Sequence, residues 1–429
     1  MFSKRVAFGF VFGAILLIAT LAGIELIASF LVPSWPARAM NPREPAQSRL
    51  LGVPFSGQPW LADSDNSWGM RDHERARTKA AGAFRAIFVG DSFVESRFTP
   101  LSLPAIVQRR VDPSERRIEA VNLGVSGTGP RSYYFRIRDV ALELQPDAIL
   151  LFFYAGNDFL PDGEGYDTWP RFTDESPGAS VLGRVMPRTN WLLQNRLRLA
   201  ENLRSNAKAP VNADEMLYEA ISGPKEERLR RLVSYVRAYH SPPISDAKVA
   251  EMLSRADDRL LDIALPHEGE QEYFLDWMIA ILLSWEAGTF AVPATREEAP
   301  RYADRGHVDA TLSWIEATQR LAHEHGVPLL LFFIPMGLVD PNYSEFWKPW
   351  PRAFAWNYTC DEWQTQLMAE LSRRGSQFVN LADNLKSIPG TYRKLDGHWS
   401  QKGEAIVAER VSLEVERLLS RRPVLSQRP

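Results

Sequence analysis

Residues 86–92, AIFVGDS, join a short apolar run to a polar turn. An apolar run that ends at a glycine is typical of a buried strand followed by a turn. Ser92 would then stand on a tight turn at the carboxyl end of that strand, where hydrolases often present a nucleophile. Taken alone, Gly90-Asp91-Ser92 is weak evidence for catalysis, because all three are ordinary turn residues. Its meaning depends on what accompanies it along the chain.

The sequence on both sides of this turn alternates between short apolar runs and amphipathic stretches. We predict strands at residues 85–89, 118–122, 148–153, 328–333 and 377–380, and helices at roughly 101–111, 131–144, 308–325, 360–374 and 401–420. Parallel strands need crossover connections, and here helices supply them. The pattern therefore predicts an α/β fold with a parallel sheet covered by helices.

The alternation stops in residues 161–305, which contain helical stretches at 226–239 and 247–263 and no convincing strand. We interpret this segment as a helical insertion. Its apolar run 274–285 is too short to cross a bilayer, so we expect a buried helix; the alternative is a lid or a membrane-resting helix. The predicted organisation is an anchor (1–32), a linker and entry segment (33–83), the α/β domain in two parts (84–160 and 306–421) and a tail (422–429).

Composition bounds the class of protein. The chain has 429 residues, 45% of them apolar and 24% charged, with a net charge of −3. It contains no long basic block, which disfavours nucleic-acid binding. Because Cys360 is the single cysteine, no disulfide can form within the chain.

The first 32 residues indicate a membrane. Lys4 and Arg5 precede the apolar run Val6–Val32, in which Glu25 is the one charge. As a helix this run would rise about 40 Å, more than the roughly 30 Å hydrocarbon core. We predict an uncleaved single-pass anchor in a bacterial inner (cytoplasmic) membrane, with the remaining chain facing the periplasm. The alternative is a cleaved signal peptide.

Three predicted strands end in polar turns that contain Ser92, Gly124 and Asn157. In an open parallel sheet these ends share one edge, where ligands bind. Ester cleavage by a serine places negative charge on an oxygen, which fixed donors must stabilise. A glycine lets a backbone N–H approach closely, and an asparagine amide is another donor.

A base for the serine stands near the carboxyl terminus, in Asp396-Gly397-His398-Trp399-Ser400. His398 can accept the Ser92 proton and return it to the leaving group, while Asp396 can orient the imidazole. Positions two apart in an extended segment point the same way, so both side chains can share a face. Ser400 is a suitable N-cap for the helix that follows.

Together and in this order, Gly-Asp-Ser, the later glycine, Gly156-Asn157-Asp158 and the Asp/His pair resemble the SGNH (GDSL-type) hydrolases. The resemblance covers about residues 85–160 and 305–420. It implies a three-layer α/β/α sandwich of flavodoxin-like type. It also implies that Ser92 is the nucleophile and His398 the base. The oxyanion donors would be the backbone N–H groups of Ser92 and Gly124 and the side chain of Asn157.

One position departs from the family pattern. Most members place the acid three residues before the histidine, where this chain has Leu395; Asp396 is two before it. The Asp-Gly-His-Trp form is similar to a membrane-anchored bacterial branch related to polysaccharide O-acetylation proteins. Residues 66–71, NSWGMR, resemble a segment common in that branch. The departure leaves the role of Asp396 open.

Four further residues are candidates for a substrate pocket, each with a plainer alternative. Asp91 and Asp158 could instead be turn or capping residues. Arg71 could form a surface ion pair instead of binding an anionic substrate. Trp399 could pack beneath the histidine loop instead of stacking on a sugar ring. His323 and His325 diverge at a helix end, so we predict no metal site there. We also predict no cofactor.

Three functions are compatible with these residues. The first is a membrane-anchored serine esterase that removes acyl groups, above all O-acetyl groups, from envelope carbohydrate or another small ester. The second is an O-acetyltransferase that uses the same triad and receives its acyl group from a multi-pass membrane partner. The third is a degenerate, non-catalytic protein that binds glycan or acts as a scaffold, against which the intact Ser92, Asn157 and His398 argue.

Overall fold

The computed structural model describes most of the α/β part of the chain. The described residues are 4–31, 70–73, 75–96, 99–114, 117–159, 186, 189, 220, 224–239, 244–254, 282–283, 285–288, 291–394 and 397–421. The chain divides into two units: residues 1–42 with 168–210, and residues 43–167 with 211–429.

The first unit contains the amino-terminal helix α1 (Lys4–Leu31). Its window Val11–Ala28 has a mean hydropathy of 2.4 and is almost wholly exposed, so within the described part of the chain it is the one helix long and apolar enough to cross a membrane. The predicted apolar helix is therefore confirmed. A signal sequence would have the same length and composition.

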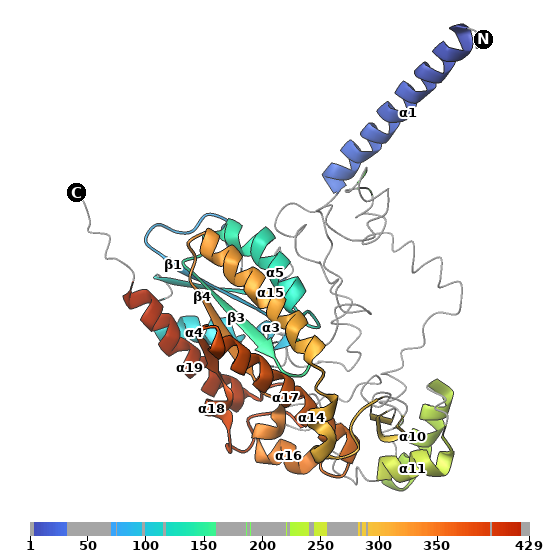
Figure 1. Ribbon diagram of the computed structural model, residues 1–429, viewed down its shortest axis with the longest axis vertical. Coiled ribbons are helices and arrows are strands. Elements are labelled where there is room, and N and C mark those ends of the chain that lie inside the picture. Colours follow the sequence, from blue (N-terminus) through green and yellow to red (C-terminus); the bar gives the residue numbers. More distant parts are fainter. Residues whose placement is uncertain are drawn as a thin grey trace. The chain divides into compact units, whose positions relative to one another are not determined.

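The second unit is built on a five-stranded parallel sheet (Figure 1). The strands are β1 (Phe84–Gly90), β2 (Ile118–Gly124), β3 (Ala148–Tyr154), β4 (Leu329–Ile334) and β5 (Phe378–Asn380), in the spatial order β2-β1-β3-β4-β5. The chain moves outward from β1 to β2 and then crosses to β3 on the other side. Strand order thus reverses beside β1, which is the location where open α/β sheets bind ligands.

Helices cover both faces of the sheet, which confirms the predicted fold class. Alternate residues of β1, Phe84, Ala86 and Phe88, share a buried core with α4 (Leu103–Val111) and α19 (Gln401–Ser420). Figure 1 shows α5 (Pro130–Arg136) and α15 (Arg305–Glu324) on the opposite face, packed against each other.

Two predicted helices differ in their bounds. The helix expected at 131–144 is α5 followed by a π turn (Ile137–Ala141) and a 3-10 turn (Leu142–Leu144). The helix expected at 360–374 begins earlier, as α17 (Pro351–Arg373), because a proline is tolerated in the first helical turn. Shorter helices in the described residues are α3 (Ser92–Glu95), α14 (Ala299–Tyr302), α16 (Pro341–Trp347) and α18 (Ala382–Leu385), with 3-10 turns at Arg296–Glu298 and Gly337–Val339.

The described residues of the 161–305 segment include α10 (Lys225–Tyr239) and α11 (Asp246–Ser254), where helices were predicted. They form a second buried cluster with Phe346 and Trp350. Leu282 and Leu283, the described members of the apolar run 274–285 apart from Trp285, are buried in this cluster. Most other residues of the segment lie outside the described ranges.

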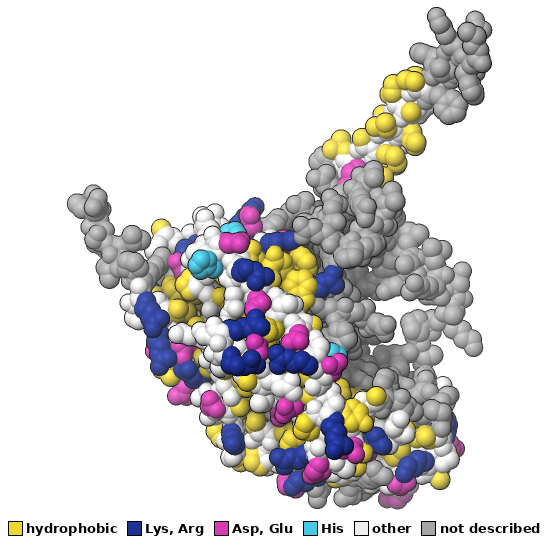
Figure 2. All heavy atoms as spheres, viewed as in Figure 1, with side chains coloured by type: hydrophobic (Ala, Val, Ile, Leu, Met, Phe, Trp, Pro, Cys, Tyr) yellow, Lys and Arg dark blue, Asp and Glu magenta, His cyan; other side chains and the backbone are white. Residues whose placement is uncertain are grey.

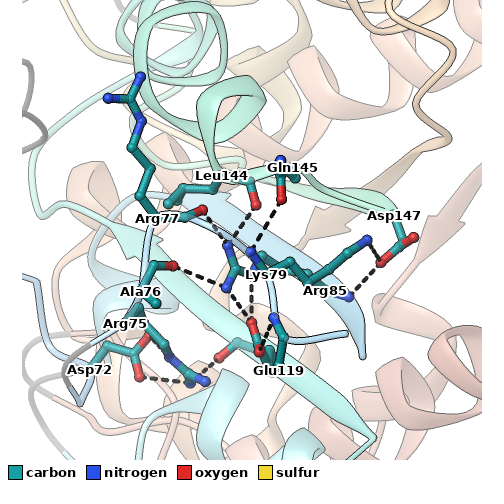
Figure 3. Close-up of polar contacts among 12 residues, drawn as sticks. Asp72, Arg75, Ala76, Arg77, Lys79, Arg85, Glu119, Leu144, Gln145 and Asp147 are labelled. Atoms are coloured by element: carbon teal, nitrogen blue, oxygen red, sulfur yellow. Dashed lines mark hydrogen bonds and ion pairs between the residues drawn. The ribbon is translucent and has the colours of Figure 1, made fainter. Parts of the chain in front are cut away.

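The amino-terminal edge of the sheet is held by a buried arginine (Figure 3). Arg85, 1% exposed, pairs with Glu119 and donates hydrogen bonds to the carbonyls of Ala76, Arg77 and Leu144. These bonds satisfy the donors of the buried guanidinium, which burial would otherwise leave unpaired. This network fixes the entry segment at the edge opposite the turn that carries Ser92.

The visible surface mixes both signs of charge. Figure 2 shows Lys and Arg side chains interspersed with Asp and Glu over the described residues of the face drawn. A mixed surface of this kind is ordinary for a soluble domain.

Candidate active site

The nucleophile turn joins β1 to α3. Asp91 is the N-cap of α3, and its Oδ1 accepts a 3.0 Å hydrogen bond from the Phe93 N–H. An aspartate at this position satisfies one of the free donors at a helix start. Ser92 is thereby fixed as the first residue of α3, and no acceptor for its own backbone N–H is found among the described residues.

The structure brings Ser92 and His398 together from positions 306 residues apart. The distance from Ser92 Oγ to His398 Nε2 is 2.7 Å. The His398 ring lies against Phe93, with 4.8 Å between ring centroids, and Trp399 packs edge-on to Phe93 at the same centroid distance. A neutral imidazole with Nε2 unprotonated accepts the Ser92 O–H at this distance, which is the geometry that general-base catalysis needs.

The loop that carries His398 is anchored by a buried carboxylate that the sequence did not reveal. Asp340, 0% exposed, accepts the N–H groups of Gly390 and Tyr392. The His398 carbonyl in turn accepts the Arg393 N–H at 2.8 Å. These bonds hold the loop at the carboxyl edge of the sheet. Asp396 lies outside the described residues, so its orienting role stays a prediction.

Asn157 lies at the same edge, beside the nucleophile turn. Its Nδ2 donates a 3.0 Å hydrogen bond to Asp91 Oδ2, while its Oδ1 has no partner among the described residues. An amide nitrogen carries two hydrogens, so this bond leaves one donor of Nδ2 available. Asp91 therefore binds both the helix start and the Asn157 side chain.

Gly124 ends β2, next to Gly90 of β1, and its N–H already has a partner. Its N–H is bonded to Asn122 Oδ1 at 2.9 Å, and a Cβ at this position would lie 2.2 Å from the Glu95 backbone nitrogen. A glycine is needed here because α3 passes so close to β2. As an oxyanion donor, the Gly124 N–H would first have to leave Asn122.

The next glycine of the same turn offers an alternative donor. Gly127 has a φ of +67°, and no acceptor for its N–H is found in the part of the chain that the structure describes. Glycine adopts this left-handed conformation without strain. In the sequence, Gly127 is the second glycine of Gly124-Val125-Ser126-Gly127. It was not predicted as a donor because it follows the strand end instead of standing at it.

The two aspartates singled out from the sequence are both support residues. Asp91 is 1% exposed, and burial raises the pKa of its carboxyl. The Phe93 N–H, His398 and Asn157 lower this pKa, but burial has the larger effect. Asp158, also 1% exposed, accepts the Tyr133 hydroxyl and the Tyr154 N–H. With their oxygens bonded inside the protein, neither offers a surface to substrate.

Arg71 and Trp399 are likewise buried, at 4% and 3% exposed. The burial of Arg71 contradicts its reading as a surface ion pair. Its guanidinium donates to the Thr99 carbonyl and lies near the carboxyl of Glu404. Trp399 packs beneath the histidine loop against Phe93.

A hollow with about 200 Å³ of empty space, part of it open to solvent, adjoins the Ser92–His398 pair. Its lining residues are Ser92, Phe93, Ser96, Thr99, His398, Trp399 and Glu404. Burial raises the pKa of the Glu404 carboxyl to about 7, although Thr99, Ser96 and Arg71 lower it. Glu404 could not be singled out from the sequence, because an acidic side chain in the first turn of a helix is ordinary.

Arg136 is a second residue that sequence reasoning missed. It is 0% exposed, and its Nη1 donates 2.9 Å hydrogen bonds to the carbonyls of Gly90 and Leu123. Its Nη2 donates to Thr128 Oγ1. Arg136 therefore ties together the ends of β1 and β2 and the turn that contains Gly127.

Comparison with known proteins gives distant likenesses. No family model matches the chain, and no curated protein matches it. Solved structures to which the chain is distantly similar include a GDSL-like lipase from Bacteroides thetaiotaomicron and a protein from Bacteroides fragilis described provisionally as an acylhydrolase. Each is 10% identical, with a TM-score of 0.31, over 78% of this chain and 88% of the other. A likeness of this size adds nothing on function, so the chemistry rests on this chain's own side chains.

Proposed function

We propose that this protein is a serine esterase in which Ser92 is the nucleophile and His398 the general base. The observation that carries the proposal is the 2.7 Å contact between Ser92 Oγ and His398 Nε2 on a strand–turn–helix at the switch point of a parallel sheet. A serine hydroxyl needs an adjacent base to become a nucleophile, and this contact supplies one.

The reaction follows from the positions of these two groups. Ser92 Oγ attacks the ester carbonyl carbon while its proton passes to His398 Nε2. The bond to the leaving alcohol then breaks, the alcohol oxygen takes that proton, and the acyl group remains on Ser92. Water attacks next, again losing a proton to His398, which returns it to Ser92 as the carboxylic acid leaves.

Backbone and side-chain donors would stabilise the oxyanion. The Ser92 N–H and the second hydrogen of Asn157 Nδ2 are the donors that the hydrogen bonding leaves available, and the Gly127 N–H is the third candidate in place of Gly124. Asp91 contributes by holding Asn157 Nδ2 at 3.0 Å.

We expect Asn157→Ala to lower kcat about a hundredfold with little change in KM, because an oxyanion donor acts chiefly in the transition state. Steady-state hydrolysis of p-nitrophenyl acetate measures both constants. Asn384→Ala, on α18, is the matched control. A rise in KM alone, at unchanged kcat, would mean instead that Asn157 binds the substrate in the ground state.

The proposed substrates are O-acyl groups, above all O-acetyl groups, on carbohydrate of the cell envelope. The small hollow beside Ser92 supports a short acyl group. The apolar helix α1 supports a place at a membrane, which we propose is the bacterial cytoplasmic membrane, with the α/β domain outside. The test is turnover of p-nitrophenyl acetate by the full-length chain in mild detergent; no turnover above buffer would refute the esterase.

The same acyl-enzyme could instead pass its acyl group to a sugar hydroxyl. A membrane helix favours this second function, since a transferase needs an acyl donor delivered at the membrane. Adding an oligosaccharide acceptor to the assay separates the two. Acetylated oligosaccharide identifies a transferase, whereas hydrolysis unaffected by acceptor identifies an esterase.

A further inference from the structure

The hollow beside Ser92 has a partly exposed side and a buried side. Ser92 and His398, on the first, are partly exposed, whereas Phe93, Ser96, Thr99, Trp399 and Glu404 are each at most 5% exposed. The buried lining thus combines two aromatic rings with the polar side chains of Ser96, Thr99 and Glu404, and we call this polar part the inner end. An acyl group bound to Ser92 Oγ has this space beside it.

The inner end presents a carboxyl group that the protein leaves unsatisfied. Neither Glu404 oxygen has a hydrogen-bond partner among the described residues, and the side chain is 1% exposed. The hydroxyls of Ser96 and Thr99, the Leu103 N–H and the Arg71 guanidinium lie near it. The two hydroxyls donate to the carbonyls of Phe93 and Leu101, at 2.7 and 3.0 Å, and the Leu103 N–H donates to Ser96 Oγ at 3.2 Å. Buried polar groups are almost always paired, so this one calls for an explanation.

We infer that the hollow is the acyl-binding pocket and that Glu404 is the residue that limits the acyl group to short chains such as acetyl. The inference rests on the proposed esterase function. An acetyl group would lie in the open part of the hollow, and the enclosed part has room for about one water molecule, which can bond to Glu404. A longer chain would displace that water and bring methylene groups against an unpaired carboxyl, which is unfavourable.

The expected discrimination is substantial. Differences of this kind in a binding pocket change kcat/KM by about ten- to a hundredfold. We therefore expect the protein to hydrolyse p-nitrophenyl acetate at least about tenfold more efficiently than p-nitrophenyl butyrate, by kcat/KM. Glu404→Leu replaces the carboxyl with an apolar group of similar size, so the acetate-to-butyrate ratio should fall about tenfold.

Three further variants complete the experiment, which uses the full-length chain in detergent. Glu404→Gln keeps size and polarity and should retain the chain-length ratio, whatever its absolute rate. Thr99→Val makes the inner end less polar and keeps the Glu404 side chain. If Glu404→Leu does not fold, a fall of the acetate-to-butyrate ratio in Thr99→Val provides the test. Glu409→Gln, exposed on the same helix, is the control for both rate and ratio.

The outcomes separate this inference from the proposed function. A wild-type preference for acetate that falls in Glu404→Leu or Thr99→Val supports it. An active enzyme that prefers butyrate, or whose ratio is unchanged in the folded variants, overturns the role of Glu404 and leaves the esterase standing. A protein inactive on every ester overturns both.

Discussion

Ser92→Ala is expected to lower hydrolysis of p-nitrophenyl acetate by on the order of 10⁴-fold or more, because the variant lacks the oxygen that forms the acyl-enzyme. Ser92 Oγ contacts His398 Nε2 at 2.7 Å, and alanine removes the attacking atom without changing the backbone at the start of α3. The measurement is kcat with purified full-length protein, after circular dichroism shows that the variant is folded.

Ser313→Ala is the matched control, since Ser313 is exposed on α15. His398→Gln should cause a loss of similar size, and the double variant should be no worse than either single one, because the two residues act as a unit. Turnover that stays within about tenfold of wild type in Ser92→Ala would contradict the mechanism.

Glu404→Gln should stabilise the protein at alkaline pH and leave it unchanged in acid. Burial raises the pKa of the Glu404 carboxyl from 4.5 to about 7, so the folded state favours the neutral form. That contribution to stability is fully present below pH 4.5 and is lost as the pH rises to 7. Glutamine stays neutral, so the variant should be more stable than wild type by about 3 kcal/mol above pH 8.

Urea unfolding of both proteins at pH 4 and pH 8.5 measures the difference. The free energies of unfolding should agree at the lower pH and diverge at the higher one. Glu409→Gln replaces an exposed glutamate on the same helix and should show no pH-dependent difference. A Glu404→Gln variant less stable than wild type at pH 8.5 would mean that the Glu404 carboxylate is paired, with Arg71 as the nearby cation.

The sheet could be predicted because buried parallel strands are continuous apolar runs, and all five observed strands lie within two residues of the predicted bounds. The pairing of Ser92 with His398 could be predicted because each stands next to a strand or helix boundary with a distinctive motif. Helix ends were predicted less well, as in α17, because a proline in a first turn is compatible with either a start or a break.

The support of the site could not be predicted. Arg136, Asp340 and Glu404 occupy positions where a solvent-exposed charge is equally compatible with the local sequence, and only the tertiary structure buries them. Gly124 was predicted as a donor because it ends a strand. In the structure this N–H donates to Asn122 Oδ1, two residues earlier. The sequence pattern does not show whether the N–H bonds to that side chain or to an oxyanion.

The central claim is that His398 activates Ser92 as a nucleophile, and covalent labelling tests it most directly. A fluorophosphonate reacts with an activated serine, and peptide mass spectrometry locates the adduct. We predict one adduct, on Ser92, that is lost in His398→Gln. Folded wild-type protein that takes up no label, or takes it up on another serine, would contradict the account.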